Sequence, residues 1–231
     1  MPYIKTSKGK IKYKVIPLFW GVKRINKKLS RENLEIVDDL SKKHKFRFML
    51  GWGTLLGAVR DSDFIDHDED TDLLCLESEE DALLDMIPDL LEKGFKIARY
   101  EPHRLLSVVR KDEYMDFYIH RQYNEKLYIC GGNPIPKQFL DEVSQIKFLQ
   151  RIYLCPKDID GVLEFWYGED WRTPVIYNNY NLSKVIVLKM RVKSWLKYHL
   201  PNCILVRIQE HEDRKFMKRE FLDKGKLDGF L

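Results

Sequence analysis

The hydrophobic positions of the chain recur first at helical and then at strand spacing. Leu34, Val37 and Leu40 lie three residues apart, which predicts an amphipathic helix that begins at a Ser30 cap and ends near His44. Lysine and arginine at the end of this segment complement the negative end of the helix dipole. The first regular element is therefore expected to be this helix.

A glycine turn separates two apolar segments further along the chain. Residues 46–50 are strand-like, a Gly-Trp-Gly turn follows, and residues 54–59 predict a short helix. A glycine turn that opens a helix leaves backbone N–H groups unpaired at the positive end of the helix dipole, which favours phosphate binding. Gly53 and Thr54 are therefore candidate phosphate-binding residues, with the Thr54 hydroxyl as an added donor.

Strands and helices alternate up to about residue 130. Residues 70–76 predict a second strand, and a helix follows from Ser78 to a stop at Gly94. Two more strand candidates, 104–110 and 114–120, are separated by a polar, hairpin-like turn. This pattern predicts a mixed α and β core.

The remainder of the chain is richer in aromatic residues and predicts mainly helical structure. The sequence thus divides into a basic lead-in (1–30), a mixed α and β core (31–130) that we expect to carry the functional site, and a mainly helical C-terminal part (131–231) that we expect to complete it. The aromatic residues favour core packing over a sugar-binding platform; they are Trp166, Tyr167, Trp171, Tyr177 and Tyr180. Residues 184–200 predict an amphipathic helix, with Leu188, Val192, Trp195 and Leu196 on one face and Lys189, Lys193 and Lys197 on another.

Composition and charge narrow the class of protein. The chain has 231 residues, 44% of them hydrophobic and 33% charged, which is typical of a folded globular protein and not of a disordered one. The net charge of +4 is too small to indicate a nucleic-acid partner. No apolar run reaches the roughly 18 residues of a membrane span, and four cysteines without a C-x-x-C pair predict reduced thiols. We therefore expect a cytoplasmic protein.

The charges are strongly segregated along the chain. Residues 1–31 carry ten Lys or Arg and no acid, whereas residues 61–92 carry fourteen Asp or Glu and no Lys or Arg. The basic N-terminus and the helix at 184–200 are compatible with peripheral contact with an anionic inner membrane face, although basic faces are more often only solvated. The acidic segment is where a cation is most needed.

Three carboxylates are candidate ligands for that cation. Asp70 and Asp72 are two residues apart on a predicted strand, so both project from one face with Cα atoms about 6 to 7 Å apart. Asp116 is flanked by apolar residues of another strand, where an unpaired charge would be costly. Mg²⁺, or Mn²⁺ in its place, binds a few carboxylates together with phosphate oxygens. We expect all three carboxylates to meet on one face.

The block GTLLGAVR, then FI, then DEDTDL at 53–73 resembles the LicD/fukutin-type phosphotransferases, which belong to the nucleotidyltransferase-fold superfamily. EFWYGEDWRTP at 164–174 is similar to another element of that family. The sequence departs from the family pattern at Asp66-His67 and at Thr71. The resemblance implies an α+β fold, with a mixed sheet flanked by helices and a helical, aromatic-rich C-terminal part.

The resemblance also implies a reaction and a role for each motif residue. The reaction is transfer of a phospho-substituent, such as phosphocholine or an alditol phosphate, from a CDP-activated donor to a hydroxyl of a glycan or lipid-linked glycan, with release of CMP. Asp70, Asp72 and Asp116 would hold Mg²⁺, and Gly53 and Thr54 would hold the diphosphate. Arg60 would neutralise developing charge, and Asp68 or His67 would accept the proton of the acceptor hydroxyl.

Other interpretations remain open from the sequence. The same site would serve an ordinary nucleotidyltransferase that moves a nucleoside monophosphate from an NTP to a small acceptor. Residues 66–77 also place acids at positions 1, 3, 5, 7 and 12 of an EF-hand Ca²⁺ loop, although Thr71 stands where that loop needs Gly. The acidic segment could instead be a solvated surface, with Asp116 on an exposed edge strand and Arg60 serving only as a helix C-terminal charge.

Overall fold

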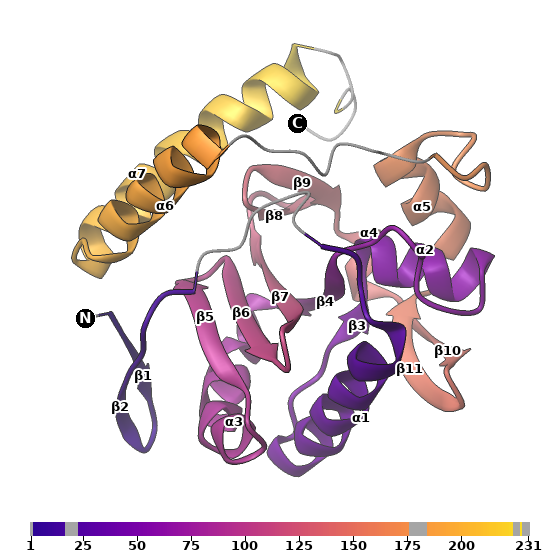
Figure 1. Cartoon of the computed structure of the whole chain (residues 1–231). Coiled ribbons are helices and arrows are strands. Elements are labelled where there is room, and N and C mark those ends of the chain that lie inside the picture. Colours follow the sequence, from indigo (N-terminus) through magenta and orange to yellow (C-terminus); the bar gives the residue numbers. More distant parts are fainter. Residues whose placement is uncertain (1, 17–22, 176–183, 224–226, 228–231) are drawn as a thin grey trace.

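The computed structural model describes the whole chain except residues 1, 17–22, 176–183, 224–226 and 228–231 (Figure 1). A mixed sheet forms its centre, with the strand order β10-β11-β3-β4-β7-β6-β5. The strands of this path are β3 (Met49–Leu50), β4 (Asp70–Leu76), β5 (Lys96–Glu101), β6 (Leu105–Arg110), β7 (Glu113–Gln122), β10 (Val143–Phe148) and β11 (Arg151–Pro156). The expected α+β class with a mixed sheet flanked by helices is confirmed.

The sheet mixes parallel and antiparallel pairs. β4 runs parallel to β7, and β3 runs parallel to β11, while the other neighbours along the path are antiparallel. β8 (Leu127–Cys130) pairs with the end of β7 and with β9 (Asn133–Pro136). β4 and β7 are therefore central strands, covered on both faces.

Helices α1 (Lys27–His44) and α3 (Glu80–Glu92) pack against each other at the sheet, as Figure 1 shows. The predicted face of α1 is buried, including Leu34, Val37 and Leu40. Its cap is Asn26 and not Ser30, because Asn26 has extended backbone and its side chain accepts the Leu29 N–H. A short 3-10 turn, η1 (Glu77–Glu79), precedes α3, which therefore begins after the predicted Ser78 cap.

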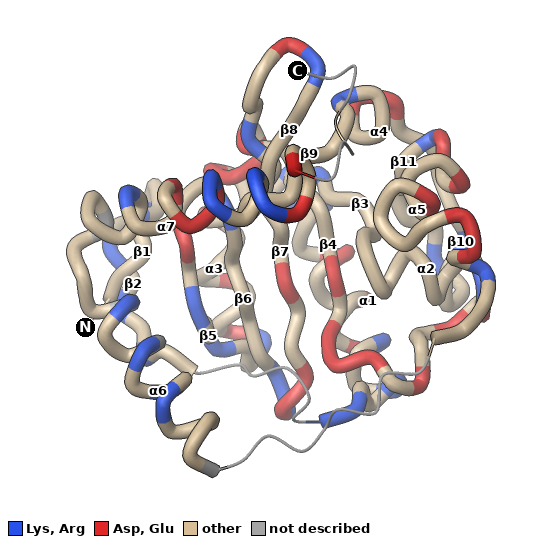
Figure 2. The backbone as a smooth tube through the Cα atoms, turned by 90° about the horizontal axis from the view of Figure 1, so that it is seen from above, with Lys and Arg blue, Asp and Glu red and all other residues tan. Residues whose placement is uncertain are grey.

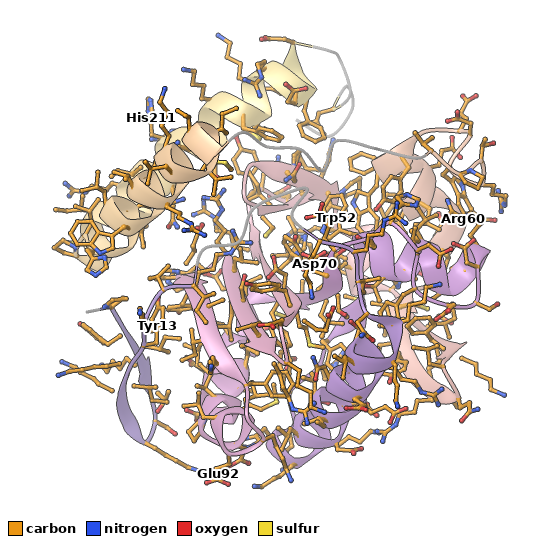
Figure 3. The ribbon with its side chains drawn as sticks, in the orientation of Figure 1. Tyr13, Trp52, Arg60, Asp70, Glu92 and His211 are labelled. Atoms are coloured by element: carbon orange, nitrogen blue, oxygen red, sulfur yellow. The ribbon has the colours of Figure 1, made fainter. Side chains whose placement is uncertain are left out.

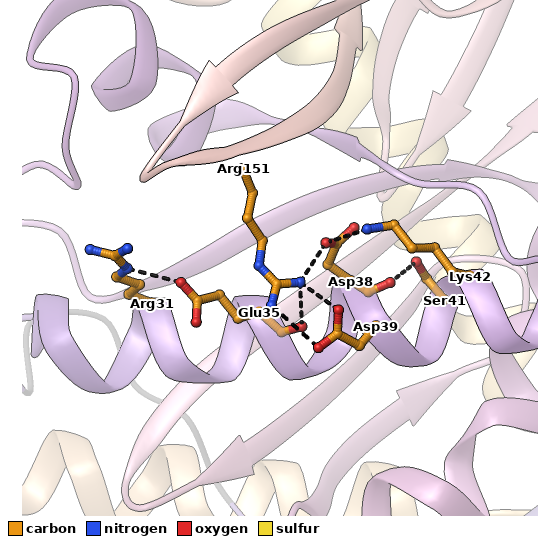
Figure 4. A network of polar contacts seen from close by, with 7 residues as sticks. All are labelled: Arg31, Glu35, Asp38, Asp39, Ser41, Lys42 and Arg151. Carbon is orange, nitrogen blue, oxygen red and sulfur yellow. Dashed lines mark hydrogen bonds and ion pairs between the residues drawn. The ribbon is translucent and has the colours of Figure 1, made fainter.

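A network of ion pairs fastens α1 to the hairpin of β10 and β11 (Figure 4). The Arg151 guanidinium donates to Asp38, Asp39 and the Glu35 carbonyl oxygen. Lys42 shares the Asp38 carboxylate at 2.8 Å, and Asp38 is buried. Because β11 pairs with β3, this network also fixes the strand that leads into the glycine turn.

The other helices differ in the part of the molecule that they contact. α2 (Trp52–Arg60) packs on β4 and on α5 (Ile159–Tyr167), while α4 (Gln138–Asp141) contacts β9 and β11. α6 (Lys184–Tyr198) and α7 (Asn202–Met217), followed by the π-helical turn η2 (Lys218–Leu222), form a hairpin at the outer side of the molecule (Figure 1). No helix in the described ranges has the length and apolarity that a bilayer crossing requires.

The arrangement of the strands adds detail to two of the predicted parts of the chain. Residues 1–30 are not only an extended lead-in, since β1 (Tyr3–Thr6) and β2 (Gly9–Lys12) form a hairpin that buries Ile4. A boundary at residue 130 cuts through the sheet, because β10 and β11 belong to it. Among the described residues from 131 onward, β9, α4, β10 and β11 precede α5, and the elements that follow α5 are helical.

The cysteines and the aromatic residues largely follow expectation. Cys75, Cys130 and Cys155 are buried free thiols, whereas Cys203 is free and exposed. Trp166 and Trp171 pack against or within the core, which supports packing as their role. Tyr177 and Tyr180 lie outside the described residues.

We predict that the stability of the fold depends on pH through His120. It lies buried near the end of β7, and burial lowers its pKa to about 4, although the Tyr118 and Cys75 backbone groups oppose the shift. Below pH 6.5 the unfolded chain takes up a proton that the folded chain does not, so stability falls as pH decreases toward 4. We expect His120 alone to account for a loss of about 2 kcal/mol between pH 7 and pH 5.

Urea unfolding of the protein and of His120→Gln at both pH values measures this effect. Between pH 7 and pH 5, His120→Gln should lose about 2 kcal/mol less stability than the wild type does. This difference does not depend on how the substitution changes the stability at pH 7. An equal loss in both proteins would show that His120 is not held neutral by the fold.

Candidate functional site

A polar row crosses four neighbouring strands of the sheet. Arg99 on β5 pairs in register with Ser107 on β6, Ser107 with Asp116 on β7, and Asp116 with Asp72 on β4. Register partners project from the same face of a sheet. Asp116 therefore lies beside Asp72 and on its side of the sheet, as the sequence predicts.

Hydrogen bonds connect the members of this row. Arg99 donates from Nε to Ser107 Oγ at 2.8 Å and from Nη2 to Asp116 Oδ2 at 2.9 Å. At the other end, the Gly53 N–H donates to Asp72 Oδ2 at 3.1 Å. The row thus runs from a guanidinium to the N-terminus of α2, and the carboxylates lie between these two positive ends.

Asp70 and Asp68 add two carboxylates to the same region. Asp70 is two residues before Asp72 on β4, so it shares its face. Burial, followed by the charges of Asp116 and Asp68, raises the pKa of Asp70 well above its usual range, and burial and Asp70 do the same for Asp72. Figure 2 shows the acidic segments of β4 and β7 side by side. Four carboxylates therefore interact at one place.

Unpartnered oxygens test whether this cluster suits a cation. Asp68 Oδ2 and Asp116 Oδ1 are buried without a hydrogen-bond partner. Buried acceptors of this kind are rare unless an ion, a ligand or a water satisfies them. Among the described residues, however, no three His, Cys, Asp or Glu side chains are gathered closely enough to form a metal site. The donor chemistry fits a hard divalent cation, although the described side chains do not form a ready-made cation site.

The N-terminus of α2 lies directly against the carboxylates. Asp68 lies so near Gly53 that a Cβ there would come within 2.2 Å of Asp68 Oδ2, so a larger residue would displace the Asp68 carboxylate. Thr54 is buried, and its hydroxyl accepts the backbone N–H of Asp72 at 2.8 Å. The structure thus gives the Thr54 hydroxyl a partner within the fold and not the open position expected for a phosphate donor.

Arg60 is not brought to this cluster. It is the last residue of α2, about 12 Å along the axis from the start of the helix. Figure 3 shows Arg60 at the far end of α2 from Trp52 and Asp70. Its guanidinium makes two hydrogen bonds of 2.9 Å to the Asp61 carboxylate, so Arg60 is already paired.

Three residues near the carboxylates were not identified from the sequence. Arg99 is one, and the others are Tyr118 and Tyr167, whose hydroxyls have a pKa raised by burial and by the charges of Asp72 and its neighbours. Tyr118 could have been found, because it lies two residues after Asp116 on the same face of β7. Tyr167 ends α5 within the 164–174 element, to which no residue role was given.

The geometry rejects two of the alternative interpretations. Residues 70–76 form a regular strand, so residues 66–77 do not form an EF-hand loop. Asp66 points into solvent and pairs with Lys27, while Glu77 pairs with His103. Asp116 is 1% exposed on a central strand, which excludes an exposed edge position.

Comparison with known proteins identifies the domain that carries this site. Residues 45–158 match the family model described as LicD/FKTN/FKRP, nucleotidyltransferase domain. The match includes the glycine turn, the Asp70 and Asp72 strand, and Asp116. It ends before residues 164–174, so the resemblance of that element stays a prediction.

Two curated relatives come from Rickettsia. Uncharacterized protein RP689 of Rickettsia prowazekii is 27% identical over 163 residues, which cover 68% of this chain and 60% of that protein. Uncharacterized protein RT0683 of Rickettsia typhi is 23% identical over 179 residues, covering 74% of this chain and 57% of that protein. The chain thus spans less than two thirds of the length of these relatives.

Three solved structures show low similarity. The lincomycin-bound lincosamide antibiotic adenylyltransferase LnuA aligns with a TM-score of 0.39 and 15% identity, over 69% of this chain and 93% of that one. ANT(2″)-Ia in complex with adenylyl-2″-tobramycin aligns with a TM-score of 0.43 and 13% identity, over 84% of this chain and 99% of that one. The solution structure of ANT(2″)-Ia aligns with a TM-score of 0.48 and 11% identity, over 87% of this chain and 96% of that one.

The matched residues contain both the glycine turn at the start of α2 and the carboxylates of β4 and β7. The family match thus identifies residues 45–158, just under half of the chain, as a LicD/FKTN/FKRP nucleotidyltransferase domain.

Proposed function

We propose that the protein transfers a phospho-substituent from a CDP-linked donor to a hydroxyl of a glycan and releases CMP. The proposal is supported most by one observation: Asp72 and Asp116 are register partners on one sheet face, beside Asp70 and the N-terminus of α2. A cluster with four carboxylates and one paired guanidinium has an excess of negative charge. Such a site suits a divalent cation and a diphosphate better than an anionic substrate alone.

Asp70, Asp72 and Asp116 would hold Mg²⁺ or Mn²⁺. When bound, the cation would polarise the phosphoryl group and stabilise the leaving CMP. Gly53 would contribute its backbone N–H, which now donates to Asp72, to the phosphate-binding end of α2. Arg99 would keep the Asp116 carboxylate in place through its hydrogen bond. Arg60 has no role in this proposal, because Asp61 already pairs with it.

Asp68 would serve as the general base. Its unpartnered Oδ2 lies against Gly53, so it is close to where the phosphates would bind. In the transfer, the acceptor oxygen forms a bond to the phosphorus that carries the substituent, while the bond from this phosphorus to the bridging oxygen of CMP breaks. The proton of the acceptor hydroxyl passes to Asp68, and CMP leaves with the bond electrons. His67 would be the alternative base.

Product analysis distinguishes this proposal from ordinary nucleotidyl transfer. The purified protein is incubated with Mg²⁺ and CDP-choline, CDP-glycerol or CDP-ribitol, with bacterial or eukaryotic glycans as acceptors, and CMP is measured. In parallel, NTPs replace the CDP compounds and pyrophosphate is measured. We expect CMP from at least one CDP donor, and its release should stop when EDTA removes the cation.

Asp68→Asn and Asp66→Asn form a matched pair for this assay, because both lie in the loop between α2 and β4 but only Asp68 lies against Gly53. CMP release should fall in Asp68→Asn and persist in Asp66→Asn. Pyrophosphate release from an NTP without CMP release from any donor would contradict the proposed reaction and support the nucleotidyltransferase alternative.

A further inference from the structure

α6 carries a row of large apolar side chains that face solvent. Val185 is 62% exposed, Leu188 62%, Val192 52% and Leu196 56%. At about 100° per residue these four positions fall on a single stripe of the helix, and Trp195, 58% exposed, lies at its edge. Single exposed apolar residues are ordinary, but a continuous stripe marks an interaction surface.

The opposite side of α6 is the side that contacts the protein. Val187, Met190 and Lys197 are half-buried, and on the helix they lie across from the apolar stripe. Lys197 forms ion pairs with Glu101 on β5 at 3.3 Å and with Glu212 on α7 at 3.6 Å. The helix is therefore docked with its apolar stripe pointing outward.

The charges beside the stripe are all positive. Residues 184–209 contain six Lys or Arg and no Asp or Glu. Lys189 and Arg191 are exposed and border the stripe on its two sides. Figure 2 shows basic positions along α6 and no acidic ones. An outward apolar stripe between basic side chains matches the layered chemistry of an anionic bilayer surface, with acyl chains below phosphates.

A second basic surface lies on the same flank of the molecule. In Figures 1 and 2 the β1–β2 hairpin and α6 both lie on the side away from α5 and β10. Every lysine of this hairpin region is exposed; they are Lys5, Lys8, Lys10, Lys12 and Lys14. Two basic elements on one flank would strengthen attraction to an anionic surface.

We infer that α6 is an interfacial helix that binds the protein to the surface of an anionic lipid bilayer. The apolar stripe enters the headgroup region, while Lys189 and Arg191 contact lipid phosphates. The side that docks on Glu101 and Glu212 stays attached to the protein. This inference is independent of the chemistry at the carboxylates, and the surface would bring the catalytic domain to membrane-borne acceptors.

Vesicle cosedimentation of the full chain tests the inference. Vesicles of phosphatidylcholine with phosphatidylglycerol should bind the protein at about 0.1 M salt, and binding should fade near 1 M as the Debye length shrinks to about 3 Å. Vesicles of phosphatidylcholine alone should bind at least about 10-fold more weakly. Lipids with brominated acyl chains should quench the tryptophan fluorescence of the wild type. They should quench the fluorescence of Trp195→Phe less, because that variant lacks the tryptophan at the edge of the stripe.

Matched variants separate the stripe from apolar exposure in general. Leu188→Ser should lower vesicle affinity by about 10-fold, because it removes a large apolar group from the interface. Ile152→Ser removes an apolar side chain that is also 62% exposed but lies on β11, and it should leave affinity unchanged. Lys189→Glu with Arg191→Glu should reduce binding further at low salt.

Three outcomes would overturn the inference. One is the absence of binding to anionic vesicles at about 0.1 M salt, where the Debye length is about 10 Å. Another is equal affinity of Leu188→Ser and the wild type. The third is a concentration-dependent dimer in solution that Leu188→Ser abolishes, which would assign the stripe to a second copy of the chain.

Discussion

Replacing Asp72 with Asn should lower the rate of transfer by at least about 100-fold, which corresponds to about 2.7 kcal/mol of lost transition-state stabilisation. Asp72 is 6% exposed, accepts a hydrogen bond from the Gly53 N–H and lies beside Asp116. Asn still offers one oxygen to that N–H but contributes no charge. The effect should therefore fall on turnover and not on folding.

In the absence of a divalent cation, Asp72→Asn should be as stable as the wild type, or more stable. Burial and Asp70 raise the folded-state pKa of Asp72 well above its usual range. At neutral pH the unfolded carboxyl has already lost its proton, so a raised folded pKa means that the ionised group destabilises the fold as pH rises toward that pKa. Asn removes this destabilisation.

Thermal unfolding in EDTA and CMP release in Mg²⁺ measure the two effects on one preparation. Asp66→Asn is the control, because Asp66 lies in the loop just before β4, pairs with Lys27 and is 86% exposed at its side chain. It should keep wild-type turnover. Unchanged turnover of Asp72→Asn would show that Asp72 is not part of the functional site. Unfolding of Asp72→Asn would show instead that Asp72 is needed for the stability of the fold.

Replacing Arg99 with Met should destabilise the protein by about 2 to 3 kcal/mol. Arg99 donates to the buried Asp116 carboxylate at 2.9 Å, and removing one member of a buried ion pair leaves the other charge uncompensated. The upper limit for such a loss is about 5 kcal/mol, and we expect less here because the Arg99 side chain is 27% exposed. This would be the largest stability effect among the site residues.

A double-mutant cycle shows whether the loss comes from Asp116. Adding Asp116→Asn to Arg99→Met should restore most of the stability, because the orphaned charge is then absent. Urea unfolding of the four proteins gives the coupling energy. Additive losses in the double variant would show that the two residues are not coupled, and that Arg99 stabilises the sheet in another way.

The sequence predicts the central strands well because their apolar runs are long and clearly bounded. β4 covers Asp70–Leu76 as expected, and β6 and β7 lie where the two strand candidates were. Their turn is a tight hairpin in which Lys111 and Asp112 both have positive φ. Since these strands carry the carboxylates, the core of the site could be predicted as well.

The peripheral strands could not be predicted because their side chains do not show a strand period. β10 has mostly exposed residues, and β11 alternates only weakly. β1 and β2 are rich in lysine and bury little besides Ile4. Such strands are held by pairing with neighbours distant in sequence, and a single sequence does not display that pairing.

The partners of the site residues depend on tertiary contacts in the same way. Arg99 meets Asp116 only because β5 and β6 place it one strand beyond Ser107. Thr54 turns its hydroxyl toward the Asp72 backbone, and Arg60 pairs with Asp61. The residue types indicated the chemistry, while the choice of partner was set by the fold.

A Mn²⁺ titration followed by electron paramagnetic resonance tests the central claim most directly, because it detects bound cation without any substrate. The wild type and Asp66→Asn should each bind Mn²⁺ at one saturable site from which Mg²⁺ displaces it, while Asp70→Asn and Asp72→Asn should lose that site. A wild type that binds no Mn²⁺, or Asp70→Asn and Asp72→Asn proteins that bind it as tightly as the wild type, would contradict the claim that these carboxylates hold the cation.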